Sequence, residues 1–158
     1  MQRLYIPAAL VGVVIVGAMF LFIGRDQQGE QEVSQVPSPK PLIQLLPDIQ
    51  GSESAKLEAV DESESSGTAW RLSANGFFQH LVVASMPDPA EGSVYEGWLV
   101  QPSPLMFFST GVMEKNEDGE WVLEYQEFAE YPTYARVVIT EETIVDEIPE
   151  IHIIEGDF

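Results

Sequence analysis

The chain of 158 residues has room for one domain of ordinary size with accessory segments, but not for two full domains. Its 26 acidic and 7 basic side chains give a formal net charge of -19, which repels phosphate backbones and argues against nucleic acid as a partner. The absence of cysteine excludes disulfides and thiolate metal ligands.

An uncharged apolar run, Leu4–Gly24, lies between Arg3 and Arg25. About 20 apolar residues cross a bilayer core as a helix, so this run predicts a transmembrane anchor. A cleaved signal peptide would have a shorter apolar core and a small-residue cleavage site, whereas this run ends in the bulky Phe20–Ile23. With the basic stub Met1–Arg3 in the cytoplasm, we expect a single-pass protein of the cell membrane whose C-terminal domain is extracytoplasmic.

Residues 25–67 are rich in Gln, Glu, Ser and Pro, a composition that buries too little apolar area to offset chain entropy. We therefore predict a disordered acidic linker over this range. One apolar segment inside it, Leu42–Leu46, is enclosed by Pro41 and Pro47. Three roles are open to this segment: a docked edge strand, a contact with the membrane surface, or a short and partly buried turn.

From Thr68 to Phe158 short apolar runs alternate with turn residues, a spacing typical of all-β domains. Asn75–Gly76 is a strong hairpin signal, because both residues tolerate positive φ, and it predicts two strands within Thr68–Ser85. Further strands are predicted at Val94–Gln101, Leu105–Met113, Glu120–Gln126, Ala135–Thr140 and Ile151–Glu155. About seven strands predict an immunoglobulin-like β-sandwich over residues 68–158, preceded by the transmembrane helix and the linker.

The stretch Val94–Gln101 carries apolar side chains on both faces, which suits a central strand. Gly97 in its middle would weaken a strand unless a neighbouring group needs the room. We expect a packing role in which the Trp98 ring or a cross-strand aromatic ring occupies that space. The alternative is a ligand that approaches the backbone at this glycine.

Several features together resemble the extracytoplasmic C-terminal domain of anti-sigma-K-type anti-sigma factors. They are the hairpin, the proline loop at Met86-Pro87, the Tyr95-x-x-Trp98-Leu99 strand, a strand containing Gly111, and the acidic strand end Val138–Glu142. The resemblance covers roughly Trp70 to Gly156. It implies a β domain outside a single membrane helix whose state is relayed to a cytoplasmic part that holds a sigma factor.

Only Met1–Arg3 precede the apolar run, so we expect this chain to lack that cytoplasmic part. If the protein regulates a sigma factor, a separate partner would have to supply the sigma-binding part. The family resemblance therefore describes the outer domain, and a membrane partner is expected.

No residue set predicts a catalytic, cofactor-binding or metal site. His80 and His152 both lie in predicted strands among apolar residues, and no serine-nucleophile motif accompanies them. The segment Glu114–Glu120 places oxygen ligands at Glu114, Asn116 and Asp118 in a spacing reminiscent of a calcium loop. The position that should hold a bidentate Glu is a tyrosine, and a strand follows instead of a helix, so a turn closed by Asp118-Gly119 is expected.

The sequence therefore predicts a non-enzymatic, membrane-anchored extracytoplasmic domain that senses or binds, with no cofactor. Its expected partner is a protein in or outside the membrane, through which it would take part in anti-sigma-type regulation of transcription. The alternative is a structural or adhesive module of the cell envelope that binds a wall or surface ligand. The oligomeric state is left open.

Overall fold

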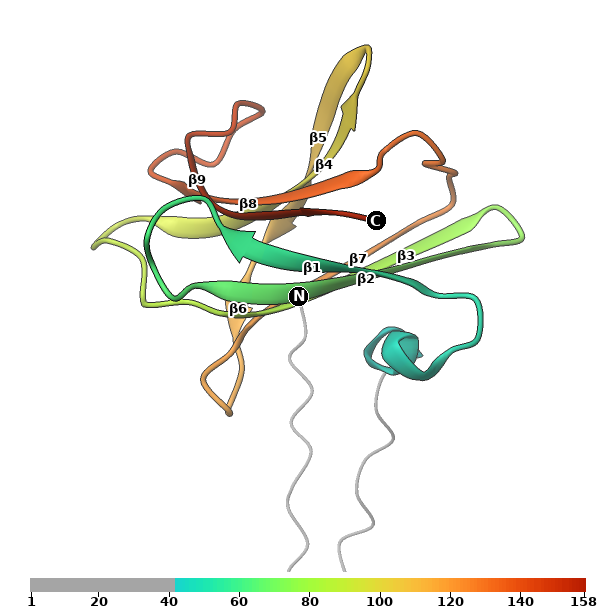
Figure 1. Cartoon of the computed structure of the whole chain (residues 1–158), viewed down its shortest axis with the longest axis horizontal. Helices are drawn as coiled ribbons and strands as arrows, with labels where there is room; N and C mark the ends of the chain where they lie inside the picture. Colours follow the sequence, from blue (N-terminus) through green and yellow to red (C-terminus); the bar gives the residue numbers. More distant parts are fainter. Residues whose placement is uncertain (1–41) are drawn as a thin grey trace, which may run out of the picture. The chain divides into compact units, whose positions relative to one another are not determined.

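The computed structural model of the protein describes residues 42–158. This part of the chain begins with a short 3-10 helix, η1 (Leu42–Asp48), and continues as nine strands (Figure 1). The strands are β1 (Glu53–Ala59), β2 (Ser66–Ala74), β3 (Phe77–Ser85), β4 (Val94–Pro102), β5 (Leu105–Val112), β6 (Glu114–Lys115), β7 (Trp121–Glu127), β8 (Arg136–Glu142) and β9 (Ile151–Asp157). Within residues 42–158 no helix has the length and apolar character needed to cross a membrane. The expected anchor at residues 4–24 lies outside the described residues.

All nine strands belong to one antiparallel sheet with the order β5-β4-β8-β9-β1-β2-β3-β7-β6. The predicted immunoglobulin-like sandwich is therefore wrong, because the sheet coils around a single core as a nearly closed barrel instead of forming two separate sheets. The all-β class is confirmed, and each of the predicted strands has a counterpart. Strands β1 and β6 were not predicted.

The two edge strands of the sheet are consecutive in the chain, and this brings the ends of the sheet together. Strand β5 pairs with β4 and strand β6 pairs with β7, with only Met113 between them. The Met113 N–H still donates to the Tyr95 carbonyl of β4 at 2.8 Å. Gly111 turns the chain with a φ of +112°, next to a shift of register between Gly97 and Trp98. The continuous segment β5–β6 thus pairs first with β4 and then with β7.

The hairpin predicted at Asn75–Gly76 is confirmed. Asn75 and Gly76 have φ angles of +55° and +74°, and β2 pairs with β3 on either side of them. Two positive φ angles match the right-handed twist of the flanking strands, which is why this dipeptide forms a tight hairpin.

The folded domain begins earlier in the chain than predicted. Strand β1 lies inside the range assigned to the disordered linker, residues 25–67, yet it is an interior strand between β9 and β2. Upstream of it, η1 docks through Leu46, which is fully buried against Leu81 of β3. The segment Leu42–Leu46 is therefore part of a 3-10 helix that docks through the buried Leu46, and not an edge strand.

Two apolar clusters hold the domain together. The interior of the barrel is filled by strand residues together with Met86 and Met113, which lie just beyond strand ends. The strand residues are Ala55, Leu57, Ala69, Phe78, Val82, Ala84, Tyr95, Leu99, Leu123, Val137, Ile139 and Ile154. The smaller cluster, under η1, contains Leu46 and Leu81 with Trp70, Leu72 and Val83 beside them. Strand β3 is consequently covered on both faces.

Gly97 has a packing role, as expected, but its neighbours are not aromatic. A Cβ at this position would lie 2.5 Å from Leu123 Cδ1 and 2.8 Å from Thr110 Oγ1. The Trp98 ring is on the opposite side of the strand. The space at Gly97 is thus needed by side chains of β7 and β5 that close the barrel.

Candidate functional site

An apolar groove of about 310 Å³ lies on the outer face of the sheet, where β4, β5 and β8 pair. It is named the Trp98 groove below, and its lining is Trp98, Val100, Leu105, Phe107, Arg136, Val138, Pro149, His152 and Glu155. Trp98 is opposite Val138 in the sheet, and Val100 is opposite both Phe107 and Arg136. Because alternate residues of a strand share a face, the pairing of these strands aligns the lining residues on one side of the sheet.

Trp98 forms the floor of this groove. Its side chain is 1% exposed, its Nε1–H donates to Thr140 Oγ1 at 2.8 Å, and its ring centroid is 6.0 Å from that of Phe107 at an angle of 77°. A buried indole whose N–H has a partner is held in one orientation. The groove therefore has a rigid aromatic base.

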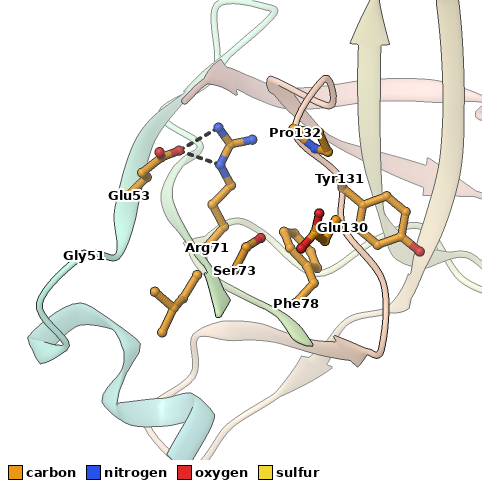
Figure 2. Close-up of a pocket in the computed structure, with 9 residues that line it drawn as sticks. Gly51, Glu53, Arg71, Ser73, Phe78, Glu130, Tyr131 and Pro132 are labelled. Carbon is orange, nitrogen blue, oxygen red and sulfur yellow. Dashed lines mark hydrogen bonds and ion pairs between the residues drawn. The ribbon is translucent and has the colours of Figure 1, made fainter. Parts of the chain in front are cut away.

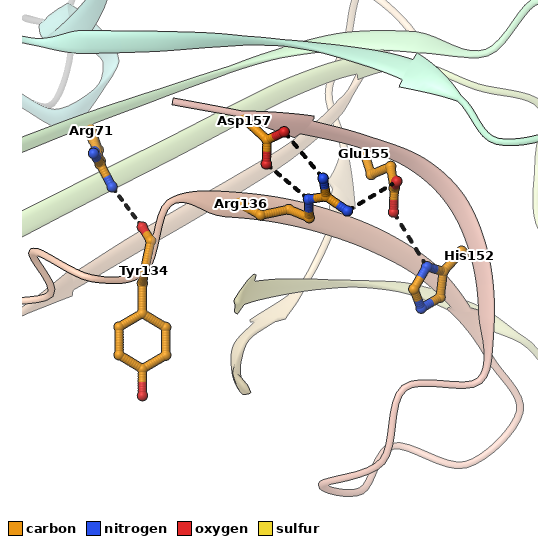
Figure 3. Close-up of polar contacts among 6 residues, drawn as sticks. All are labelled: Arg71, Tyr134, Arg136, His152, Glu155 and Asp157. Carbon is orange, nitrogen blue, oxygen red and sulfur yellow. Dashed lines mark hydrogen bonds and ion pairs between the residues drawn. The ribbon is translucent and has the colours of Figure 1, made fainter. Parts of the chain in front are cut away.

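Charged side chains form one rim of the groove (Figure 3). Arg136 donates from Nε to Asp157 at 2.8 Å and lies 3.4 Å from Glu155, which in turn lies 3.5 Å from His152. The hydrogen bond with Asp157 raises the pKa of Arg136 and lowers the pKa of Asp157. The positive charge of Arg136 is thus neutralised by Glu155 and Asp157 within the rim.

Exposed apolar side chains lie on the strands and connections that line the groove. Leu105 is 69% exposed on the β4–β5 hairpin, and Ile148 is 67% exposed on the β8–β9 connection, residues 143–150. Phe107 and Ile151 are also exposed. Single exposed apolar residues are ordinary, but a group of them around an apolar groove is typical of an interaction site.

A second pocket, of about 380 Å³, opens near the start of β1 (Figure 2). Arg71 points into it and is bound on three sides: Nε donates to Glu53 at 2.7 Å, Nη1 donates to the Tyr134 carbonyl at 2.6 Å, and the guanidinium lies 4.2 Å from the Phe158 ring centroid. These contacts join β1, β2 and the end of the chain. Arg71 therefore has a structural role, and the Trp98 groove is the stronger candidate site.

The two histidines have different surroundings, and neither is hydrogen-bonded to a hydroxyl group of the described residues. His80 is fully buried, its Nδ1 lies 3.0 Å from the Trp70 carbonyl, and burial lowers its pKa to about 4. His152 is half-exposed at the rim of the Trp98 groove. A neutral buried ring bound to a carbonyl serves packing, whereas His152 is placed to contact a ligand.

In the acidic segment Glu114–Glu120, Glu114 and Lys115 form β6, and residues 116–120 form the predicted turn between β6 and β7. The Gly119 N–H donates to the Asn116 carbonyl at 3.1 Å, and the Asn116 side chain accepts from the Glu120 N–H at 2.9 Å. Asn116, which a calcium loop would use as a ligand, thus closes the turn instead. Among residues 42–158 no group of three or more acidic or histidine side chains is gathered for a metal ion.

Two buried carboxylates were missed by the sequence reading. Glu96 of β4 is 2% exposed and Glu142 of β8 is 1% exposed, and each has one oxygen, Oε2, without a hydrogen-bond partner. Burial raises the pKa of Glu96, and the charges of Glu142 and Asp146 add to that rise. The available signal was a glutamate within a strand predicted to be apolar on both faces, "VYEGWLV".

Comparison with protein-family models, curated proteins and solved structures found no match for this chain. The resemblance to anti-sigma-K-type domains accordingly stays a prediction. Function has to be argued from the Trp98 groove and its surroundings.

Proposed function

We propose that the domain is a non-enzymatic binding module that docks a protein partner in the Trp98 groove. The expected helix Leu4–Gly24 would hold it at a membrane, with the domain outside the cytoplasm. The observation that carries the proposal is a rigid aromatic floor surrounded by exposed apolar side chains. Apolar pockets with a few fixed polar groups at the rim are the usual form of a binding site.

The position of the groove in the domain suits a tethered binder. The β4–β5 hairpin and the β8–β9 connection rise on one side of the domain, whereas η1, the first described element, lies on the other (Figure 1). A tether that enters at η1 would leave the groove open to partners on the far side.

The charge of the domain indicates what kind of partner fits. Each Lys and Arg among residues 42–158 is already in a salt bridge: Lys56 with Glu58, Arg71 with Glu53, Lys115 with Asp88, and Arg136 with Glu155 and Asp157. Most of the acidic side chains have no such partner, so the surface potential is strongly negative. We therefore expect a protein whose apolar side chain enters the groove and whose flanking residues are Lys or Arg.

The same charge argues against an anionic lipid surface as the occupant, since like charges repel. Regulation of the anti-sigma kind is a narrower version of the proposal, in which the docked partner would carry the sigma-binding part. A wall polymer as the ligand would instead make the protein a structural or adhesive envelope module.

Photo-crosslinking in the native cells would test the proposal. A photoreactive residue at Leu105 or at Ile148 of the full chain is expected to trap the same partner protein. At Phe128, which is 86% exposed on the β7–β8 connection, the same residue should not trap it. Phe107→Ser should abolish the crosslink, and salt well above about 0.15 M should weaken it.

Two results would contradict protein docking. One is a crosslink to a wall polymer, which would favour the envelope module. The other is a protein crosslink that Phe107→Ser leaves unchanged, because the contact would then lie outside the groove. The thermal unfolding midpoint of Phe107→Ser serves as the control for folding, since Phe107 is 41% exposed and its loss should cost little.

A further inference from the structure

The buried carboxylates Glu96 and Glu142 lie on the same outer face of neighbouring strands. Glu96 is opposite Thr140 in the sheet, and Glu142 is opposite Val94, two positions further along each strand. Diagonal neighbours of this kind are about 7–8 Å apart between their backbones, well within reach of two glutamate side chains. The β8–β9 connection follows directly after Glu142.

Each carboxylate is held by one oxygen and leaves the other without a partner. Glu96 Oε1 accepts a hydrogen bond from Ser109 Oγ of β5, and Glu142 Oε1 accepts from the Glu150 N–H at 2.9 Å. Oε2 of both residues is buried without a partner. Fixed first oxygens and free second oxygens are the arrangement expected of groups that await a further ligand.

The described part of the chain offers no positive charge to neutralise this pair. Its Lys and Arg side chains are engaged in salt bridges elsewhere, and His152 lies 3.5 Å from Glu155. A buried carboxylate without a counter-charge destabilises the fold, and a second carboxylate beside it adds repulsion. A bound cation would remove both costs.

We infer that Glu96 and Glu142 bind a divalent cation of the Ca²⁺ type beneath the β8–β9 connection. The neighbouring groups are hydroxyl and carboxylate oxygens, from Ser109, Thr140 and Asp146. Oxygen ligands in a flexible surrounding suit Ca²⁺, whereas Mg²⁺ needs a near-ideal octahedron. Two carboxylates with water in the remaining positions resemble the weak sites of extracellular modules, with a Kd of about 10⁻⁴–10⁻³ M.

The cation site and the Trp98 groove are joined by the β8–β9 connection. The Glu150 N–H that binds Glu142 follows Pro149, which is a wall of the Trp98 groove. A cation at Glu142 would therefore hold that wall in place.

Calcium titration of the full chain in detergent, after treatment with a chelator, would test the site. Calorimetry with CaCl₂ in about 0.15 M salt, which screens the surface charge, is expected to show one saturable site. Glu96→Gln and Glu142→Gln should each weaken Ca²⁺ binding by about tenfold or more, because changing even a residue that only orients a metal ligand costs about 10–100-fold in affinity. Asp118→Asn removes the same charge from the exposed β6–β7 turn and should leave the affinity unchanged.

A second measurement needs no variant of the ligands. Trp98 is two residues from Glu96 on the same strand face and hydrogen bonds to Thr140, so it should sensitise Tb³⁺ luminescence at this site. Ca²⁺ should displace the Tb³⁺, and Trp98→Phe should remove most of the signal. The inference is overturned by the absence of saturable Ca²⁺ binding, by Gln variants that bind within about twofold of the wild type, or by a Tb³⁺ signal that Trp98→Phe does not change.

Discussion

At the scale of single residues, three buried ionisable side chains lack a full set of hydrogen-bond partners. Glu96, Glu142 and His80 are each at most 2% exposed, and each has a polar atom without a partner. Such atoms are rare in folded proteins, because burial without a hydrogen bond costs free energy. For the two glutamates a cation is the proposed compensation, whereas His80 avoids the cost of a charge by staying neutral.

His80 should make the stability of the domain depend on pH. Burial lowers its pKa in the folded state to about 4 from an ordinary value of 6.5. The neutral His80 contributes its full stabilisation of the fold above pH 6.5. Between pH 6.5 and about 4 only the unfolded chain binds a proton at this residue, so the stabilisation is lost as the pH falls to the folded-state pKa. The loss amounts to about 3 kcal/mol.

Urea unfolding at several pH values would measure this effect. The difference in unfolding free energy between wild type and His80→Phe should change across that range, since the variant lacks the titrating ring. A difference that is constant with pH would mean that His80 is not held neutral by burial. Groups common to both proteins cancel in this comparison.

At the scale of elements, η1 and β1 extend the domain into a polar part of the chain. Strand β1 buries only Ala55 and Leu57, and the rest of its side chains are polar or partly exposed. It is stable because it pairs on both sides, with β9 and β2. Helix η1 in turn covers Leu81 on the outside of the sheet.

Leu46→Ala should destabilise the domain by about 2–5 kcal/mol, because it removes a fully buried side chain and leaves a cavity under η1. Leu45→Ala is the matched control, since Leu45 is 36% exposed and should cost about 0.5 kcal/mol or less. Thermal or urea unfolding followed by circular dichroism would compare them. An equal loss of unfolding free energy in Leu46→Ala and Leu45→Ala would show that η1 is not docked through Leu46.

At the scale of the whole molecule, the proposed function joins an acidic binding domain to an expected membrane anchor. The negative surface would repel anionic lipid, and the partner proposed for the Trp98 groove is accordingly basic. The orientation predicted from Leu4–Gly24 would place the groove outside the cytoplasm. Extracellular modules have Ca²⁺ sites of the weak affinity expected for Glu96 and Glu142.

Single-cysteine labelling would test that orientation, and the cysteine-free chain makes the experiment clean. Glu117→Cys lies in the exposed β6–β7 turn and should react with a membrane-impermeant maleimide on intact cells or spheroplasts. The unmodified chain should remain unlabelled. Labelling that occurs only after lysis would reverse the predicted topology.

The sequence by itself determined the features that are local. Turn residues such as Asn75-Gly76 and Gly119 need particular φ angles, and the alternation along β7 shows which side is buried, so the all-β class and seven of the strands could be predicted. Only the tertiary structure decided the closure of the barrel, the inclusion of β1 and the burial of Glu96. Those features depend on which distant strand lies beside each segment, and the periodicity of a strand is the same whichever strand it pairs with.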